Sequence, residues 1–377
     1  MNGFDPALAA SPAPALPVPA GLGWDAGWAG AFTPFIDDRR RPARVVAAHR
    51  GAWVIALADG DRDAVLAGRL RYDAVGPADL PVVGDWVAAE ADGAAGPAVI
   101  SAVLPRRSAF GRNKLDGQIA AEQLLASNVD VALIVTGLDG DFNLRRLERY
   151  LAVVWSGGAT PVILLNKADA ASDPDGARFA AEAIAPGVEV RLISALERAG
   201  IPELARDHLA PGRTAVVLGS SGAGKSTLLN ALLGEERAKT GAVRSDDAKG
   251  RHTTTHRELH RLPGGGLLID TPGIRSLGVS GADEGLAPAF SDVTDLAADC
   301  RFADCRHQGE PGCAVLAAVS DGRLSSDRLE SHRKLEREAA HVARQSDRLL
   351  READRRKWKA IHSSVKQHME RKYGSDR

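Results

Sequence analysis

The stretch GSSGAGKST, residues 219–227, restricts the fold of this 377-residue chain more than any other feature. It follows the apolar run TAVVLG and opens KSTLLNALLG, so it joins an expected buried strand to an expected helix. Its glycines allow the backbone to wrap around a phosphate, and N–H groups at the start of the helix face the anion. Lys225 would reach the β- and γ-phosphates, and the Ser226 hydroxyl would ligate Mg²⁺. The alternative is a glycine-rich turn that carries a surface lysine. The candidate phosphate-binding residues are Gly219, Ser220, Ser221, Gly222, Ala223, Gly224, Lys225, Ser226 and Thr227.

Four further apolar runs indicate the sheet that such a loop requires. VDVALIVTG, TPVILLN, VEVRLIS and GLLID are separated by segments with helical periodicity, such as NLRRLERYLAVVWSGG. Continuous apolar runs are typical of strands that are buried on both faces, as in a parallel sheet. Alternating strands and helices therefore predict a doubly wound α/β domain.

A second motif, Asn166-Lys-Ala-Asp169, closes the run TPVILLN. The Asp169 carboxylate can accept two N–H bonds from the guanine edge, whereas adenine lacks that donor pair. Lys167 can lay its stem over the base, and Asn166 can tie loops together. Such a short motif often occurs by chance, so it indicates guanine binding only in combination with the phosphate loop. Backbone N–H groups at the end of VEVRLIS can also reach the base O6. The candidate base-binding residues are Asn166, Lys167, Ala168, Asp169, Ser194 and Ala195.

Two segments downstream of the phosphate loop complete a nucleotide site. In the turn Asp270-Thr-Pro-Gly273, Asp270 can hold Mg²⁺ through water and the Gly273 N–H can contact a γ-phosphate. The segment GRHTTTH, residues 250–256, lies between them. A threonine there can meet Mg²⁺ and the γ-phosphate, and Thr253, Thr254 and Thr255 are equal candidates. Without its neighbours this segment would be interpreted as a threonine-rich turn.

The order of these motifs along the chain is unusual. The guanine motif and Ser194-Ala195 precede the phosphate loop, whereas GTPases usually begin with the phosphate loop. Joining the usual ends and cutting after Asp270-Thr-Pro-Gly273 gives the order seen here. The ends of a compact domain often lie close together, so such a circular permutation can keep every strand in place. Five motifs that agree under one cyclic shift exclude a chance match.

The hydrolytic step is less well determined. Ile274 follows Gly273, where Ras-type GTPases carry a glutamine that orients the attacking water. Isoleucine cannot orient water, so we expect slow intrinsic turnover and a water-positioning group from another loop or a partner. His252 and Thr254 are the candidate catalytic residues, with His256 nearby. The alternative is that these histidines are solvated loop residues without a role in hydrolysis.

The chain has three cysteines, all between residues 300 and 313. An odd, clustered set fits poorly with a disulfide framework. Cys300, Cys305, His307 and Cys313 instead supply the three thiolates and one imidazole of a closed, structural Zn²⁺ site. The alternative is three buried thiols.

Residues 43–108 carry a different pattern. ARVVAAHRGAWVIAL and DAVLAGRLRYD alternate apolar and polar residues, glycine-containing turns interrupt them, and VVGDWVAAE and PAVISAVL follow. Short strands at a spacing of about 8–12 residues predict a small β-barrel or sandwich.

The two ends differ from the rest of the chain. The N-terminus is Ala/Pro-rich, without the basic region of a signal peptide, and is expected to be unstructured, although four aromatic residues between positions 24 and 35 could dock. Residues 323–377 hold 16 Lys/Arg and 9 Asp/Glu in a helical pattern, which favours RNA contact over a merely solvated face. The whole chain has a formal net charge of −1, so a nucleic acid must meet a local basic patch. No apolar run approaches the ~20 residues of a membrane span, so we expect a cytoplasmic protein without membrane contact.

Taken together, these motifs resemble the circularly permuted GTPases of the small ribosomal subunit biogenesis (RsgA/YjeQ) family. The resemblance covers residues 43–335 and includes GRLRY, VGDWV, DFNLRRLERYL, NKAD, GSSGAGKST, GRHTTTH, DTPGIR and CRFADCRHQGEPGCAV. It implies a multidomain α/β protein with an N-terminal OB-fold β-barrel, a central circularly permuted P-loop GTPase domain and a C-terminal zinc-binding and helical domain. The expected divisions are a disordered tail at 1–40, the barrel at 41–108, the GTPase domain at 109–285, and the zinc-binding domain with its basic helix at 286–377.

The resemblance also implies an activity. It is Mg²⁺-dependent, ribosome-stimulated GTP hydrolysis in late maturation of the small subunit, which drives release from its rRNA. The implied partners are GTP, GDP and the small subunit with its rRNA, and the cofactors are one structural Zn²⁺ and Mg²⁺ with GTP. Off the ribosome we expect a monomer. The alternative, which Ile274 favours, is an rRNA-binding checkpoint module that uses GTP as a ligand with little hydrolysis. A zinc-delivery GTPase is disfavoured because the metal site is closed.

Overall fold

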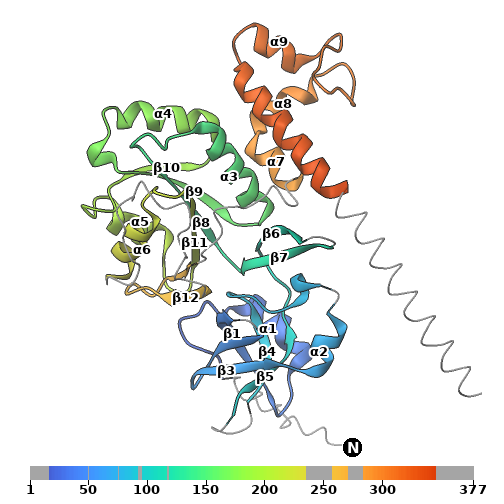
Figure 1. The fold of residues 1–377 in the computed structure, drawn as a ribbon, viewed down its shortest axis with the longest axis vertical. Coiled ribbons are helices and arrows are strands. Elements are labelled where there is room, and N and C mark those ends of the chain that lie inside the picture. The colour runs from blue at the N-terminus through green and yellow to red at the C-terminus, as the bar shows by residue number, and fades with distance from the viewer. Residues whose placement is uncertain are drawn as a thin grey trace, which may run out of the picture.

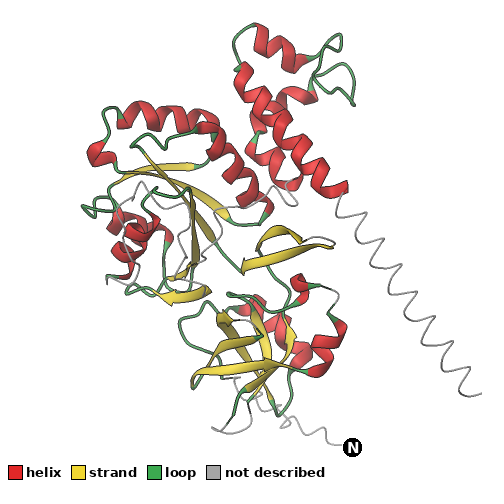
Figure 2. Ribbon diagram, in the orientation of Figure 1, coloured by secondary structure: helices red, strands yellow, loops and turns green. Residues whose placement is uncertain are grey.

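The computed structural model describes residues 17–49, 51–74, 76–91, 96–116, 119–234, 257–270 and 283–344. A β-barrel, an α/β domain and a helical C-terminal part follow one another along the long axis (Figure 1). Strands occur in the first two parts, whereas the described residues of the third part are helices and loops (Figure 2). The predicted multidomain architecture is therefore confirmed.

Five strands close the barrel. They pair in the order β1-β2-β3-β5-β4, and β4 pairs back with β1, which is an OB-type arrangement. The prediction of strands is wrong for GRLRYD, which forms helix α2 (Gly68–Asp73) at the crossover that follows β3. An Arg69–Asp73 pair at helical spacing supports that turn. The strands are β1 (Arg40–His49), β2 (Ala52–Leu57), β3 (Gly60–Leu66), β4 (Trp86–Glu90) and β5 (Ala98–Val103).

A helix before β1 corrects the expectation of an unstructured tail for residues 17–40, whereas residues 1–16 lie outside the described residues. Helix α1 (Ala26–Phe32) begins after Asp25, whose carboxylate accepts a 3.0 Å hydrogen bond from the Trp28 N–H. The side chains of Trp28 and Phe32 are 3% and 0% exposed. Burying such large rings offsets the entropy lost when the segment becomes ordered. The rings of Trp24 and Trp28 pack against Trp86 of β4, so the segment folds onto the core that the barrel shares with the α/β domain.

The α/β domain has a mostly parallel sheet in the order β10-β9-β8-β11-β13-β12, in which only β12 runs antiparallel. Its central strand β8 (Val131–Gly137) is buried along its whole length, which explains its continuous apolar sequence. The prediction of a doubly wound domain is confirmed. The other strands are β9 (Thr160–Asn166), β10 (Glu189–Ile193), β11 (Thr214–Gly219), β12 (Arg257–Arg261) and β13 (Leu267–Asp270). The helices are α3 (Leu144–Ser156), α4 (Pro174–Ile184), α5 (Ile201–His208) and α6 (Lys225–Leu233).

Strand β1 joins the barrel to the α/β sheet. Its first half pairs with β4, and its second half pairs with β12, where Ala47 lies opposite Glu258. A β-bulge between Val45 and Ala47 falls between the two halves. The barrel and the α/β domain therefore share one continuous sheet of 11 strands. A two-stranded ribbon, β6 (Ala109–Asp116) and β7 (Ile119–Ser127), connects them along the chain.

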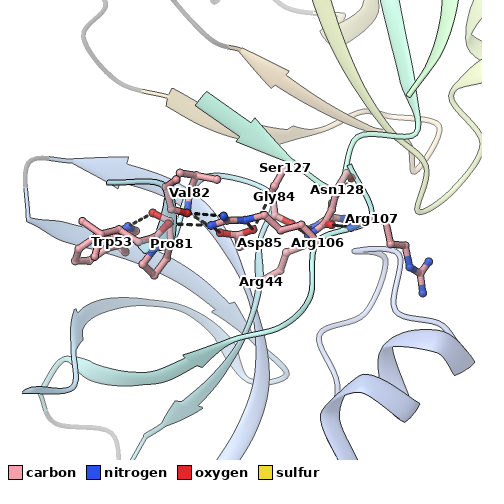
Figure 3. A network of polar contacts seen from close by, with 12 residues as sticks. Arg44, Trp53, Pro81, Val82, Gly84, Asp85, Arg106, Arg107, Ser127 and Asn128 are labelled. Atoms are coloured by element: carbon pink, nitrogen blue, oxygen red, sulfur yellow. Dashed lines mark hydrogen bonds and ion pairs between the residues drawn. The ribbon is translucent and has the colours of Figure 1, made fainter. Parts of the chain in front are cut away.

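Arg44 of β1 is a buried cation at this junction (Figure 3). Its guanidinium donates hydrogen bonds to the carbonyls of Gly84 (3.3 Å) and Asn128 (3.2 Å) and to Thr214 Oγ1 (2.8 Å). Burial lowers the pKa of Arg44 to about 10, although the nearby Asp130 and Asp85 oppose the shift. Arg44 is therefore charged at neutral pH, and it ties the barrel to the first residue of β11.

Asp85 organises the same junction from the barrel side (Figure 3). This carboxylate is 0% exposed and accepts hydrogen bonds from the Arg106 Nε and Nη2 (2.8 and 2.7 Å), the Ser127 hydroxyl (2.6 Å) and the Val82 N–H (2.8 Å). Each of these donors is thereby satisfied by one buried anion. The carboxylate thus holds together segments that precede β4, follow β5 and end β7.

We expect Asp85→Ala to destabilise the barrel by about 3–5 kcal/mol, because it leaves the Arg106 guanidinium without its buried counter-ion. The midpoint of urea unfolding followed by tryptophan fluorescence measures this, since Trp24, Trp28, Trp53 and Trp86 lie in or against the barrel. Asp73→Ala is the control, because it removes a carboxylate that is 59% exposed and paired with Arg69. An equal shift for both variants would contradict this account.

The C-terminal part contains α7 (Asp283–Ala289), α8 (Ser291–Ala298), α9 (Ala314–Ser320) and a helix over residues 326–344. Arg328 of the last helix is buried and donates to Glu148 Oε1 of α3 (2.8 Å) and Asp292 Oδ1 of α8 (2.9 Å). Helix α3 also packs against α7 (Figure 1). The predicted basic C-terminus beyond residue 344 lies outside the described residues. Within the described part of the chain, no helix has both the length and the apolar character needed to cross a membrane.

Candidate nucleotide site and candidate metal centre

The glycine-rich loop has the predicted strand–loop–helix context, since β11 ends at Gly219 and α6 begins at Lys225. Gly219, Gly222 and Gly224 have φ values of +143°, +84° and +92°, which side-chain-bearing residues rarely adopt. A Cβ on Gly219 would also collide with the Val135 carbonyl of β8. The loop can therefore take this shape only with glycine at these positions. The Ser226 side chain, the predicted Mg²⁺ ligand, is exposed on the first turn of α6.

Asn166 ties the two halves of the predicted site together. Its Nδ2 donates a 2.8 Å hydrogen bond to the Ala223 carbonyl in the glycine-rich loop. Its Oδ1 accepts a 2.9 Å bond from the Ala195 N–H. Asn166 is 2% exposed, so both bonds are shielded from water. A Cβ on Gly224 would collide with Asn166 Nδ2. This close approach, like its positive φ, requires a glycine at position 224.

The other base-site candidates lie at the same edge of the sheet. Lys167 has a left-handed φ of +64° and turns the chain into a short 3₁₀ helix (Ala168–Ala170) that leaves the Asp169 side chain exposed. Ser194 is buried, and its hydroxyl accepts a 3.1 Å bond from the Glu197 N–H. Because β9 and β10 are parallel neighbours, the motifs that follow them are adjacent.

Asp270 ends β13, which runs parallel to β11, so it lies at the edge of the sheet that carries the glycine-rich loop. The structure therefore brings the described candidates together on the carboxyl ends of β9, β10, β11 and β13. The remaining candidates, His252, Thr254 and Gly273, lie outside the described residues, as do Thr253, Thr255 and Ile274.

The loop between β8 and α3 was not among the predicted site residues. Strand β8 lies between β9 and β11, and the chain leaves β8 and β11 in opposite directions across the sheet. Ligands of doubly wound domains bind at such a topological switch point. Asp139 and Asp141 of this loop contact Lys167 and Ser220. Their signal in the sequence is LDGDF directly after a buried strand.

A second cluster lies between α8 and α9. The ligand atoms of Cys300, Cys305, His307 and Cys313 are all within 4.8 Å of one another. The Cys300 and Cys313 sulfurs are 3.9 Å apart, and His307 Nδ1 lies 3.6 and 3.4 Å from them. A tetrahedron with Zn–S of about 2.3 Å and Zn–N of about 2.0 Å has edges of about 3.8 and 3.5 Å. The four side chains thus fit a structural zinc ion, as the sequence predicts.

The protein environment acts differently on two of these thiols. Burial opposes ionisation of Cys300, but hydrogen bonds from the N–H groups of Val315 and Ala314 lower its pKa below the ordinary value. Burial raises the pKa of Cys305 to about 11, and the neighbouring Cys313 and Cys300 add to this shift. Zinc binds thiolates, so loading the site must release protons.

Comparisons with known proteins agree with this geometry. The model of a family described as RsgA GTPase matches residues 103–280, and one described as 50S ribosome-binding GTPase matches residues 214–372. A protein of Opitutus terrae is 51% identical over 350 residues, which covers 90% of this chain and 95% of the relative. A protein of Streptomyces coelicolor is 44% identical over 355 residues, covering 93% and 95%. Both relatives are named small ribosomal subunit biogenesis GTPase RsgA.

Two solved structures share the architecture. The crystal structure of YjeQ from Thermotoga maritima has a TM-score of 0.60 and 27% identity, and the match covers 78% of this chain and 97% of that one. YloQ, described as a circularly permuted GTPase, has a TM-score of 0.56 and 24% identity over 82% of this chain and 96% of that one. The second match concerns the fold alone.

Proposed function

We propose that this chain, which belongs to the RsgA GTPase family, hydrolyses GTP during maturation of the small ribosomal subunit. The observation that carries this proposal is the double hydrogen bond of Asn166. It fastens the guanine motif to the phosphate loop and to Ser194-Ala195. A base reader and a phosphate cradle that are joined in this way act on one nucleotide.

The proposed roles follow from position. Asp169 reads the guanine edge, Lys167 covers the base, and the backbone of Ser194-Ala195 contacts O6. The loop from Gly219 to Thr227 holds the phosphates, Lys225 stabilises the charge that develops on them, and Ser226 and Asp270 hold Mg²⁺. His252 and Thr254 remain the candidates for the hydrolytic step, and the Gly273 N–H for the γ-phosphate.

The proposed partner is the small subunit with its rRNA, in keeping with the names of the relatives. An OB-type barrel offers a surface for single-stranded nucleic acid, and the basic C-terminus offers phosphate contacts. We further propose the division into a barrel at 41–108, a GTPase domain at 109–285 and a zinc-binding domain at 286–377. The protein would act in the cytoplasm and be a monomer off the ribosome.

The second candidate function is an rRNA-binding checkpoint module that holds GTP but hydrolyses little of it. The observation that favours it is Ile274, which stands where a water-orienting glutamine is expected. The two functions differ in whether phosphate is released repeatedly when the small subunit is present.

Multiple-turnover GTP hydrolysis with and without purified small subunits separates the two functions. We expect stimulation on the order of tenfold or more, since an activating partner can raise GTPase rates by far larger factors. Lys225→Ala should lower the stimulated rate by at least about 100-fold, because it removes a cation from the developing phosphate charge. An unchanged rate on adding subunits to the wild-type chain favours the checkpoint module.

A further inference from the structure

Two carboxylates on one loop contact both halves of the nucleotide site. The loop follows β8, whose last residue, Gly137, pairs with Asn166 of β9, while Val135 pairs with Gly219 of β11. This register places the loop between the guanine motif and the glycine-rich loop. The Leu138 N–H also donates a 2.9 Å hydrogen bond to the Asn166 carbonyl, which fixes the start of the loop.

The first carboxylate belongs to Asp139. Its Oδ2 is ion-paired with the Lys167 ammonium. The space for it depends on Gly137, since a Cβ there would lie 2.6 Å from Asp139 Oδ1 and 3.6 Å from Lys167 Cδ. Lys167 can cover the base only while its stem keeps one direction. An anion that holds the ammonium at the end of the stem restricts that direction.

The second carboxylate belongs to Asp141. Its Oδ2 accepts a hydrogen bond from the Ser220 hydroxyl, and its Oδ1 pairs with Arg146 in the first turn of α3. The Ser220 carbonyl accepts a bond from Lys225, so the residue is held from both sides. The charge of Arg146 balances that of Asp141, which would otherwise repel phosphate. The backbone at Arg146 is fixed at the start of α3, because its backbone N–H donates a 3.0 Å hydrogen bond to Asn143 Oδ1.

We infer that Asp139 and Asp141 are positioning residues for the nucleotide, Asp139 through Lys167 and Asp141 through Ser220. This inference rests on the proposed function. A positioning role affects nucleotide affinity, whereas a purely structural role affects folding stability. The Asp139 and Lys167 side chains are 44% and 30% exposed, and such a pair adds only about 0–1 kcal/mol to folding stability. For Asp139 the effect should therefore be found in nucleotide affinity, with the thermal midpoint nearly unchanged.

Two double-mutant cycles test the inference through the dissociation constant of a fluorescent GDP analogue. One cycle combines Asp141→Ala with Ser220→Ala, and the other combines Asp139→Ala with Lys167→Ala. Each aspartate variant should raise Kd about five- to tenfold, the usual range for one hydrogen bond or ion pair to a positioned group. The Kd of each double variant should not exceed the larger Kd of its two single variants, because both changes remove the same interaction.

The controls use other pairs in the same domain. The cross-combination Asp139→Ala with Ser220→Ala should multiply the two single effects, and Asp175→Ala, which removes an exposed partner of Arg178, should leave Kd unchanged. Asp141→Asn keeps the shape of the side chain and replaces Asp141→Ala if that variant does not fold. Unchanged Kd in the aspartate variants, or multiplied effects within a cycle, overturns the inference while the proposed function stands. A wild-type chain that does not bind GDP overturns both.

Discussion

Asp169→Asn should convert the chain from a GTP-using to an XTP-using protein. In the proposed function, the Asp169 carboxylate accepts hydrogen bonds from N1–H and the 2-amino group of guanine. An asparagine amide offers one acceptor and one donor, so its NH₂ group faces the 2-amino group without a partner. Xanthine carries a carbonyl at that position, which accepts from the amide. A site with a mispaired polar group rejects the wrong ligand by about 10⁴–10⁵-fold, and we expect a change in the GTP/XTP ratio of at least about 10³-fold.

The measurement is kcat/KM for GTP and for XTP in the presence of small subunits. Asp175→Asn is the matched control, because it neutralises another exposed aspartate of the same domain, one that is paired with Arg178 at 2.9 Å. It should leave the ratio of the two substrates unchanged. If Asp169→Asn loses activity with both nucleotides equally, then Asp169 does not read the base.

The sequence allows the nucleotide site to be predicted because its residues follow the ends of recognisable strands. Parallel pairing brings those ends to one edge, so Asn166, Ser194 and Gly219 become neighbours whatever their order along the chain. The shape of the phosphate loop can also be predicted from its glycines, because Gly219, Gly222 and Gly224 have positive φ values that other residues rarely adopt.

The features that were missed depend on contacts distant in sequence. The β1–β12 pairing joins residues about 210 positions apart, and no local pattern specifies it. Helix α1 has only seven residues, too few to be stable alone, so its order comes from Trp28 and Phe32 packing into the core that the barrel and the α/β domain share. Asp139 and Asp141 look like ordinary turn residues until the sheet order places them between two motifs.

Removal of zinc should unfold the connection between α8 and α9. The segment 300–313 has little regular structure and joins two helices of eight and seven residues. Such short helices are marginal by themselves. Structural zinc contributes about 10–16 kcal/mol of binding free energy in isolated zinc-finger peptides at neutral pH, and that energy is folding energy. The connection over residues 300–313 therefore depends on the metal for its folded shape.

We expect one zinc ion per chain by elemental analysis, and none in Cys313→Ser, which replaces a ligand that is 7% exposed. Limited proteolysis should then cut within residues 300–313, whereas GDP affinity should stay within about twofold, because the nucleotide site lies in another domain. Because the pKa of Cys305 is about 11, zinc affinity should rise with pH as protons leave more easily.

The control for the zinc experiment is Asp304→Ala, an exposed residue of the same segment that is not among the four ligands. It should keep the zinc and the protease resistance of the wild-type chain. A Cys313→Ser chain that still binds one zinc ion would mean that the remaining two thiols and His307 suffice, with water as the fourth ligand. This outcome would contradict the expectation that the ion needs all four side chains. Loss of GDP binding together with zinc would instead show that α3, which Arg328 holds to the C-terminal part, transmits the unfolding to the nucleotide site.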